Sequence, residues 1–156
     1  MPLSMPLSAA AGEPREHALI RLLGHAGLIP LVGLALLVWL VTPDLQAWVA
    51  LALAAYAALI ASFLGGIHWG IGWSQPARLP QRKVHFIWGV VPSLLAWPGL
   101  VMPPHAGLVW LGLVLIGCYV VDRKLYAQAG LASWLKLRFR LSGIAASSCF
   151  IGAGAL

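Results

Sequence analysis

Acidic residues are scarce in this sequence, with four Asp and Glu in 156 residues, and charged residues of both signs make up 9%. Soluble domains average about 25% charged residues. Apolar residues make up 61% of the chain, which is more than a water-exposed surface accommodates at this length. These proportions exclude a water-soluble domain and predict one compact bundle within a lipid bilayer.

Cysteine is also rare, and its placement excludes two further classes of protein. Cys118 and Cys149 both fall inside apolar runs, which argues against the disulfide framework of a small exported protein. Neither has a partner at the spacing of a metal site. The net charge of +6 is carried outside the apolar runs, so we interpret it as a signal of membrane orientation rather than of nucleic-acid binding.

Five apolar runs are present, and each is near the length of about 20 residues with which a helix crosses the hydrocarbon core. We therefore predict an all-α, multi-pass membrane protein, with residues 1–18 as a disordered tail and residues 19–156 as one five-helix domain. The last run is short, so its helix is expected to begin in the basic segment before it, with Arg138 and Arg140 extending to the headgroups. The predicted spans are residues 22–41, 46–73, 84–101, 106–121 and 139–156.

The ten Lys and Arg residues all fall on one side of the membrane under this assignment. Because positively charged connections stay in the cytoplasm, the N-terminus is predicted to be cytoplasmic and the C-terminus outside. The eight Trp residues fall near the span ends, where the indole ring prefers the headgroup interface. The repeated MPLS at the start makes Met5 an alternative first residue to Met1.

Small residues recur every four positions along the second span and form a continuous ridge. Such ridges let helix backbones approach closely in lipid. We interpret the ridge as packing within the bundle, with a homo-oligomer interface as the alternative. Kinks are expected at three prolines within spans, Pro30, Pro92 and Pro98. The ridge consists of Ala50, Ala54, Ala58, Ser62, Gly66 and Gly70.

The histidines are the candidate chemical groups, because an ionisable residue at membrane depth indicates a functional site. His25, His68 and His85 are expected in the cytoplasmic third of the bilayer, near Asp122. Three imidazoles and a carboxylate at one depth could hold a metal, haem or a quinone head. The simpler interpretation is that His68 forms a hydrogen bond to a neighbouring helix.

For Asp122, the simpler interpretation is an ion pair with Arg123, Arg138 or Arg140. No Ser/His/Asp set, phosphate-binding loop or paired carboxylates are recognisable, so we expect no enzyme. A proton or ion relay would end before the outer half of the bilayer, where no charged residue falls.

Several segments resemble an uncharacterised membrane family, domain of unknown function 3429, which includes the mitochondrial transmembrane protein 69. The most specific segment is SFLGGIHWG, from Ser62 to Gly70. The resemblance covers residues 20–155 and implies a multi-span membrane protein in which His68 and its glycines belong to a shared motif. The residues that carry it include Pro30, Ser62, Gly65, Gly66, His68, Trp69, Gly70, Asp122 and Arg138.

From these observations we expect a non-enzymatic protein of the bacterial cytoplasmic membrane that serves a larger inner-membrane complex as accessory, assembly or scaffold protein. One alternative is a binder of haem, quinone or metal through His68 with His25 or His85. A second is a small-molecule channel or carrier that acts as an oligomer. The expected partners are the lipid bilayer, the larger complex or a second copy of the chain, and not nucleic acid.

Overall fold

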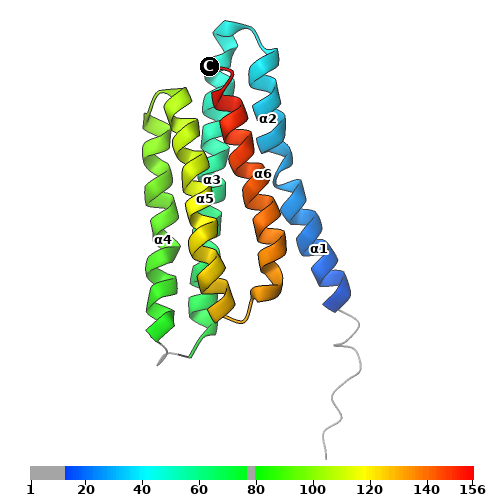
Figure 1. The fold of residues 1–156 in the computed structure, drawn as a ribbon, viewed down its shortest axis with the longest axis vertical. Helices are drawn as coiled ribbons and strands as arrows, with labels where there is room; N and C mark the ends of the chain where they lie inside the picture. The colour runs from blue at the N-terminus through cyan, green and yellow to red at the C-terminus, as the bar shows by residue number, and fades with distance from the viewer. Residues whose placement is uncertain (1–12, 77–79) are drawn as a thin grey trace, which may run out of the picture.

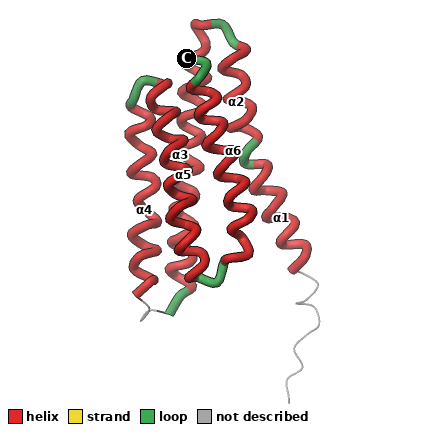
Figure 2. The backbone as a smooth tube through the Cα atoms, viewed as in Figure 1, coloured by secondary structure: helices red, strands yellow, loops and turns green. Residues whose placement is uncertain are grey.

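The computed structural model describes residues 13–76 and 80–156, and every regular element in them is helical (Figure 1). Short connections join the helices (Figure 2). The described part of the chain therefore confirms the all-α prediction. The elements are α1 (Glu13–Ala26), α2 (Ile29–Leu40), α3 (Pro43–Ser74), α4 (Pro80–Val101), α5 (Pro104–Gln128), the 3-10 turn η1 (Ala132–Trp134) and α6 (Leu135–Ala153).

The first helical segment is interrupted near its middle, at Gly27 and Leu28, between α1 and α2. Pro30 lies in the first turn of α2, where the backbone N–H that proline lacks is not needed. The hydroxyl of Tyr56 on α3 donates a 3.1 Å hydrogen bond to the Gly27 carbonyl and so satisfies backbone exposed by the break. The bend predicted at Pro30 thus coincides with a real change of helix.

The N-terminal boundary requires a correction. Helix α1 begins at Glu13, so residues 13–18, which we predicted as part of a disordered tail, are helical. An acidic residue and a proline are both favourable in a first helical turn, which explains the earlier start. Residues 1–12 of the predicted tail lie outside the described residues.

Four helical segments in the described ranges are long and apolar enough to cross a membrane. They correspond to the first four predicted spans, and each begins before the predicted start. Helix α6 is not among them, because its 19 residues include Lys136, Arg138 and Arg140 in the first two turns. The fifth span remains a prediction. The four segments are Arg15–Leu40, Pro43–Ser74, Gln81–Val101 and Pro104–Gln128.

Helix α3 lies at the centre of the bundle and packs against α2, α4, α5 and α6. Helix α6 runs along α5 and α2, and α1 diverges from the bundle (Figure 1). The α3–α4 and α5–α6 connections lie at the same end as the start of α1, and the C-terminus lies at the other end (Figure 1). We call the end with the α3–α4 and α5–α6 connections the network end, and the end with the C-terminus the turn end.

The small residues of α3 divide between the inside and the outside of the bundle. Ala50, Ala54 and Ala58 are buried, as predicted for intramolecular packing, whereas Ser62, Gly66 and Gly70 are exposed. In the second half of α3, the buried residues lie on a neighbouring strip of the helix surface, which includes Gly65 and Gly72. The ridge is therefore a packing surface over its first half only.

Candidate functional site

Four buried ionisable side chains meet near the network end of the bundle. His68 comes from α3, His85 from α4, Asp122 from α5 and Arg138 from α6. The first three are 0%, 0% and 1% exposed, and Arg138 is 7% exposed. They meet because the α3–α4 and α5–α6 connections are at the same end, so these four helix ends lie at one level (Figure 1).

Asp122 is the acceptor at the centre of the cluster. Its Oδ1 accepts hydrogen bonds from His68 Nε2 at 2.8 Å and from Trp88 Nε1 at 3.0 Å. Its Oδ2 accepts one from the Arg138 guanidinium at 2.7 Å. Arg138 also donates to the Ser142 hydroxyl. We call His68, His85, Trp88, Asp122, Arg138 and Ser142 the Asp122 network.

The two imidazole rings are joined directly. Their Nδ1 atoms are 2.9 Å apart, and the rings are stacked with centroids 5.1 Å apart. With both rings neutral and His68 donating from Nε2 to Asp122, the His68 Nδ1 atom accepts, and His85 is the donor. The His85 Nε2 atom is then a bare acceptor, and it has no hydrogen-bond partner in the described part of the chain.

The charges of the network balance within it. The Asp122 carboxylate is negative and the Arg138 guanidinium positive, so with neutral histidines the cluster carries no net charge. A buried pair of this kind is tolerable because hydrogen bonds satisfy both ions, and removing one ion leaves the other unpaired in a low dielectric. Side chains of α3, α4 and α6 therefore share the Asp122 carboxylate of α5 as their common acceptor.

Glycines explain how α3 and α4 come close enough for the histidines to touch. A Cβ on Gly65 would overlap the Gly89 carbonyl, and a Cβ on Gly89 would overlap the Trp69 ring. The Trp69 Nε1 atom donates to the Phe86 carbonyl of α4 at 3.1 Å. The SFLGGIHWG segment thus builds the α3–α4 contact that presents His68 to His85 and Asp122.

The structure brings together some of the residues selected from sequence and separates others. His68, His85 and Asp122 meet, and of the three arginines considered for Asp122, Arg138 is the partner. Arg138 therefore does not extend to the headgroups, because the carboxylate holds it inside. Arg140 is exposed, as expected.

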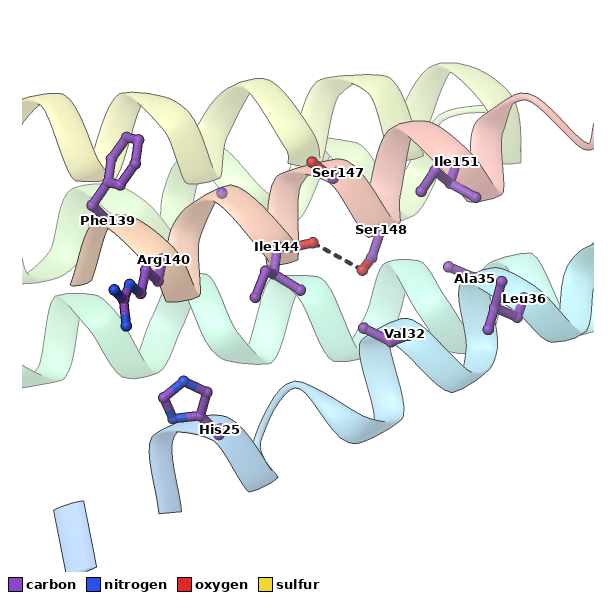
Figure 3. Close-up of a pocket in the computed structure, with 11 residues that line it drawn as sticks. His25, Val32, Ala35, Leu36, Phe139, Arg140, Ile144, Ser147, Ser148 and Ile151 are labelled. Carbon is purple, nitrogen blue, oxygen red and sulfur yellow. Dashed lines mark hydrogen bonds between the residues drawn. The ribbon is translucent and has the colours of Figure 1, made fainter. Parts of the chain in front are cut away.

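His25 lies apart from the other candidate histidines. Its Nδ1 atom is 2.7 Å from the Arg21 carbonyl on its own helix, and its side chain is exposed. It faces Arg140 at one end of a groove of about 410 Å³ between α1–α2 and α6, and Ser147 and Ile151 lie farther along (Figure 3). A shared site for His25 with His68 or His85 is therefore corrected: α1 diverges from the bundle and carries His25 away.

Three residues of the site were missed from sequence. Trp88 and Ser142 belong to the network, and the Tyr126 ring packs against His68 with centroids 5.3 Å apart. Trp88 was predicted to lie at the membrane interface and was not predicted to contact Asp122. Tyr126 and Ser142 lie on the inward faces of α5 and α6, one turn along from Asp122 and Arg138, and that spacing is the signal that would have found them.

The contacts of His68 do not favour its use as a ligand of a metal or of haem. Both ring nitrogens of His68 contact protein groups, so ligation would require breaking a bond. Within the described ranges, no group of three or more His, Cys, Asp or Glu side chains could hold a metal ion. Toward the turn end, the described segments carry no further charged side chain until Asp44.

Comparison with known proteins places the chain in a family. A family model described as "Protein of unknown function (DUF3429)" matches residues 17–154. The chain belongs to the DUF3429 family. The match begins within α1 and covers α2 to α6 completely, so the Asp122 network lies wholly within the DUF3429 region. No curated protein and no solved structure matches this DUF3429 member.

Proposed function

We propose that this DUF3429 member is a non-enzymatic accessory or assembly protein of the bacterial cytoplasmic membrane, attached to a larger membrane complex through its basic end. The observation that carries the proposal is a set of cationic side chains collected at the network end. We call this set the basic rim. It consists of Arg15, Arg21, Arg82, Lys83, Arg123, Lys124, Lys136 and Arg140.

The basic rim is solvent-accessible, and its cations form no salt bridge within the described residues. Arg82 is half-buried and the other rim side chains are exposed. In the part of the chain that the structure describes, both salt bridges belong to Asp122, so no rim cation is in one. The Arg82 guanidinium donates to the Gly72 carbonyl and lies over the Trp73 ring, whereas the exposed rim charges are available to an acidic protein surface or to anionic lipid headgroups.

The sidedness of these charges supports an orientation with the rim in the cytoplasm. It also supports α6 as a fifth span, because α6 then carries the chain from the basic rim to the turn end. The N-terminus would be cytoplasmic and the C-terminus outside. A C-terminal alkaline phosphatase fusion is expected to be active and a C-terminal green fluorescent protein fusion dark. The reverse pattern would place the C-terminus in the cytoplasm and would contradict this topology.

Affinity purification from native membranes in mild detergent tests the partner. We expect the wild-type chain to recover a stoichiometric protein, and the double variant Arg123→Gln, Lys124→Gln to recover less of it. Gln128→Ala is the matched control, because Gln128 is exposed at the end of the same helix and carries no charge. Recovery of lipid alone, in repeated purifications, would count against the proposal.

The exposed half of the small-residue ridge supports a contact within the membrane. A Cβ added at Gly66 or at Gly70 would meet no atom within 4 Å, so the backbone there is open to a partner helix of the complex or of a second copy. Gly66→Ile is expected to reduce the recovered partner or the oligomer, as measured by crosslinking. Gly33→Ile on α2 is the control, since its added side chain also meets nothing. An equal effect of both variants would exclude this surface.

A further inference from the structure

The groove of about 410 Å³ between α1–α2 and α6 is predominantly apolar (Figure 3). Residues four positions apart share one face of a helix, and two such rows of α6 line the groove. Gly143 leaves space on this face, because a Cβ there would meet no atom within 4 Å. The two rows are Arg140, Ile144 and Ser148, and Phe139, Gly143, Ser147 and Ile151.

The helices that form the groove are in contact at the turn end and separate toward the network end. The Trp39 indole of α2 donates to the Ile151 carbonyl of α6 at 3.0 Å. A Cβ on Gly152 would lie 3.9 Å from the Cα atom of Ala35, so α2 and α6 are also close there. Helix α1, in contrast, diverges from the bundle (Figure 1). A chain-like molecule can therefore enter the groove from the network end.

The groove has the depth of one leaflet of a bilayer. From Arg140 to Ile151 it follows α6 for eleven residues, which corresponds to about 17 Å at the rise of an α-helix. One leaflet contributes about 15 Å, half of the hydrocarbon core. Leu36 and Ile144 line the groove and are exposed on the outside of the bundle, so its side is open to lipid. The Ser148 hydroxyl donates to the Ile144 carbonyl of its own helix. Beyond Arg140, the groove therefore fits one hydrocarbon chain.

The charge at the network end of the groove selects an anionic head. Arg140 and His25 face each other there from α6 and α1 (Figure 3). Arg140 is in neither salt bridge of the described residues, and none of the described residues that line the groove is acidic. The His25 Nδ1 atom is held by the Arg21 carbonyl, which leaves Nε2 for another partner. A guanidinium binds phosphate through paired N–H groups, so the complementary head is a phosphate.

We propose that this groove binds one anionic phospholipid from the leaflet at the network end. The phosphate would lie between Arg140 and His25, one acyl chain would follow the groove to Ile151, and the other chain would stay in the surrounding bilayer. Basic pockets between membrane helices are known to bind anionic lipid head groups. The bound lipid would fill the space where α1 diverges and so connect α1 to α6. The proposal takes α6 as a membrane-spanning helix, as proposed above, but it requires neither an attached complex nor a particular orientation.

Native mass spectrometry of the purified full-length chain in detergent tests the proposal. The probe is dioleoyl phosphatidylglycerol, and dioleoyl phosphatidylcholine is the comparison, because it has the same chains and a zwitterionic head. We expect one saturable site for phosphatidylglycerol, with binding roughly fivefold tighter than that of phosphatidylcholine, the factor that one basic side chain contributes toward anionic lipid. Equal affinities would show that the groove binds the chains alone. Displacement of the lipid by inorganic phosphate would show a phosphate site that does not use the groove. Either result overturns the proposal, whereas the topology test by C-terminal fusions is independent of both.

A pair of charge variants distinguishes this site from general attraction to the basic rim. Arg140→Gln removes the cation at the groove and should weaken phosphatidylglycerol binding roughly fivefold to tenfold. Lys136→Gln removes another exposed cation one turn earlier on the same helix, outside the groove, and should leave binding unchanged. Equal losses in the two variants would show that the lipid is attracted by the rim as a whole, and would refute the site.

A pair of glycine variants tests whether the acyl chain occupies the groove. Gly143→Trp fills the groove and should abolish the tight binding, whereas Gly117→Trp on α5 should not. Both glycines are exposed, and a Cβ at either would meet no atom within 4 Å, so both variants are expected to fold. Wild-type affinity in Gly143→Trp would refute the proposal even if Arg140→Gln weakened binding. A dimer that phosphatidylglycerol does not displace and that Gly143→Trp removes would instead assign the groove to a second copy of the chain.

Discussion

The two ends of the bundle hold their helices together by different interactions. At the network end, one carboxylate accepts hydrogen bonds from side chains of α3, α4 and α6. At the turn end, the buried side chains are small or aliphatic, and backbones approach where no side chain intervenes. A Cβ on Gly107 would overlap the Gly99 carbonyl, and a Cβ on Gly152 would overlap Leu53.

The difference concerns how the stabilising free energy is distributed. Lipid gives helices no hydrophobic reason to associate, so the turn end depends on many weak van der Waals contacts. Hydrogen bonds from the Trp39 and Trp110 indoles to backbone carbonyls of neighbouring helices add to these contacts, but no buried ion is involved. The network end concentrates its interactions on one buried ion. Single substitutions should therefore be more damaging at the network end, and the damage should be greatest where a charge loses its partner.

The largest effect is expected from Asp122→Asn. Asn keeps the shape and can still accept from His68 and Trp88, but it leaves the buried Arg138 guanidinium without its counter-charge. Breaking a buried ion pair in this way costs about 3–5 kcal/mol. We expect the free energy of unfolding, measured by denaturation of the purified protein in detergent, to fall by that amount. Asp44→Asn is the control, since Asp44 is exposed and forms no salt bridge in the described ranges.

The same measurement separates charge from packing. In the double variant Asp122→Asn, Arg138→Met the unpaired charge is gone, so much of the lost stability should return. A double variant no more stable than Asp122→Asn would show that the hydrogen bonds, and not the ion pair, hold this end together.

An intermediate effect is expected at the turn end from Gly107→Ala. The added Cβ would meet backbone of α4, which cannot move aside as a flexible side chain can, and overpacking of this kind costs about 1–3 kcal/mol. Gly117→Ala is the control on the same helix, because its Cβ would meet nothing within 4 Å. It should be neutral or stabilising by up to about 1 kcal/mol, through helix propensity. Equal unfolding free energies for the two variants would refute close α4–α5 packing as the basis of the turn end.

The helices could be predicted well because the length and apolarity of each run are properties of that run alone. The length and apolarity of residues 46–73 suffice to predict α3, whatever the other helices do. The start of α1 was predicted too late because Glu13 is charged and Pro14 disfavours the interior of a helix. Both residues nevertheless suit a first helical turn. The break at Gly27 depends on the Tyr56 hydroxyl of another helix.

The candidate site was recovered in part because depth can be read from sequence and helix order cannot. His68, His85 and Asp122 were selected for their common depth, and they do meet. His25 has the same depth, but it lies on a helix that diverges from the bundle, which no spacing along the chain reveals. Arg138 shows the limit most clearly. Its position near a span end is equally compatible with extension to the headgroups and with burial against Asp122, and only the packing of α5 against α6 decides.

The smallest effect is expected from Ser142→Ala, which tests whether the periphery of the network contributes as much as its centre. Ser142 accepts from Arg138, but the guanidinium keeps its bond to Asp122 when the hydroxyl is removed. The Arg138–Ser142 bond lies within α6, and the net contribution of such a hydrogen bond is about 0.5–1.5 kcal/mol. The free energy of unfolding should therefore fall by roughly that amount in Ser142→Ala. Ser147→Ala, exposed on the same helix, should leave it unchanged. A loss near that of Asp122→Asn would instead mean that Ser142 positions Arg138, so that the ion pair depends on the hydroxyl and the network acts as one unit.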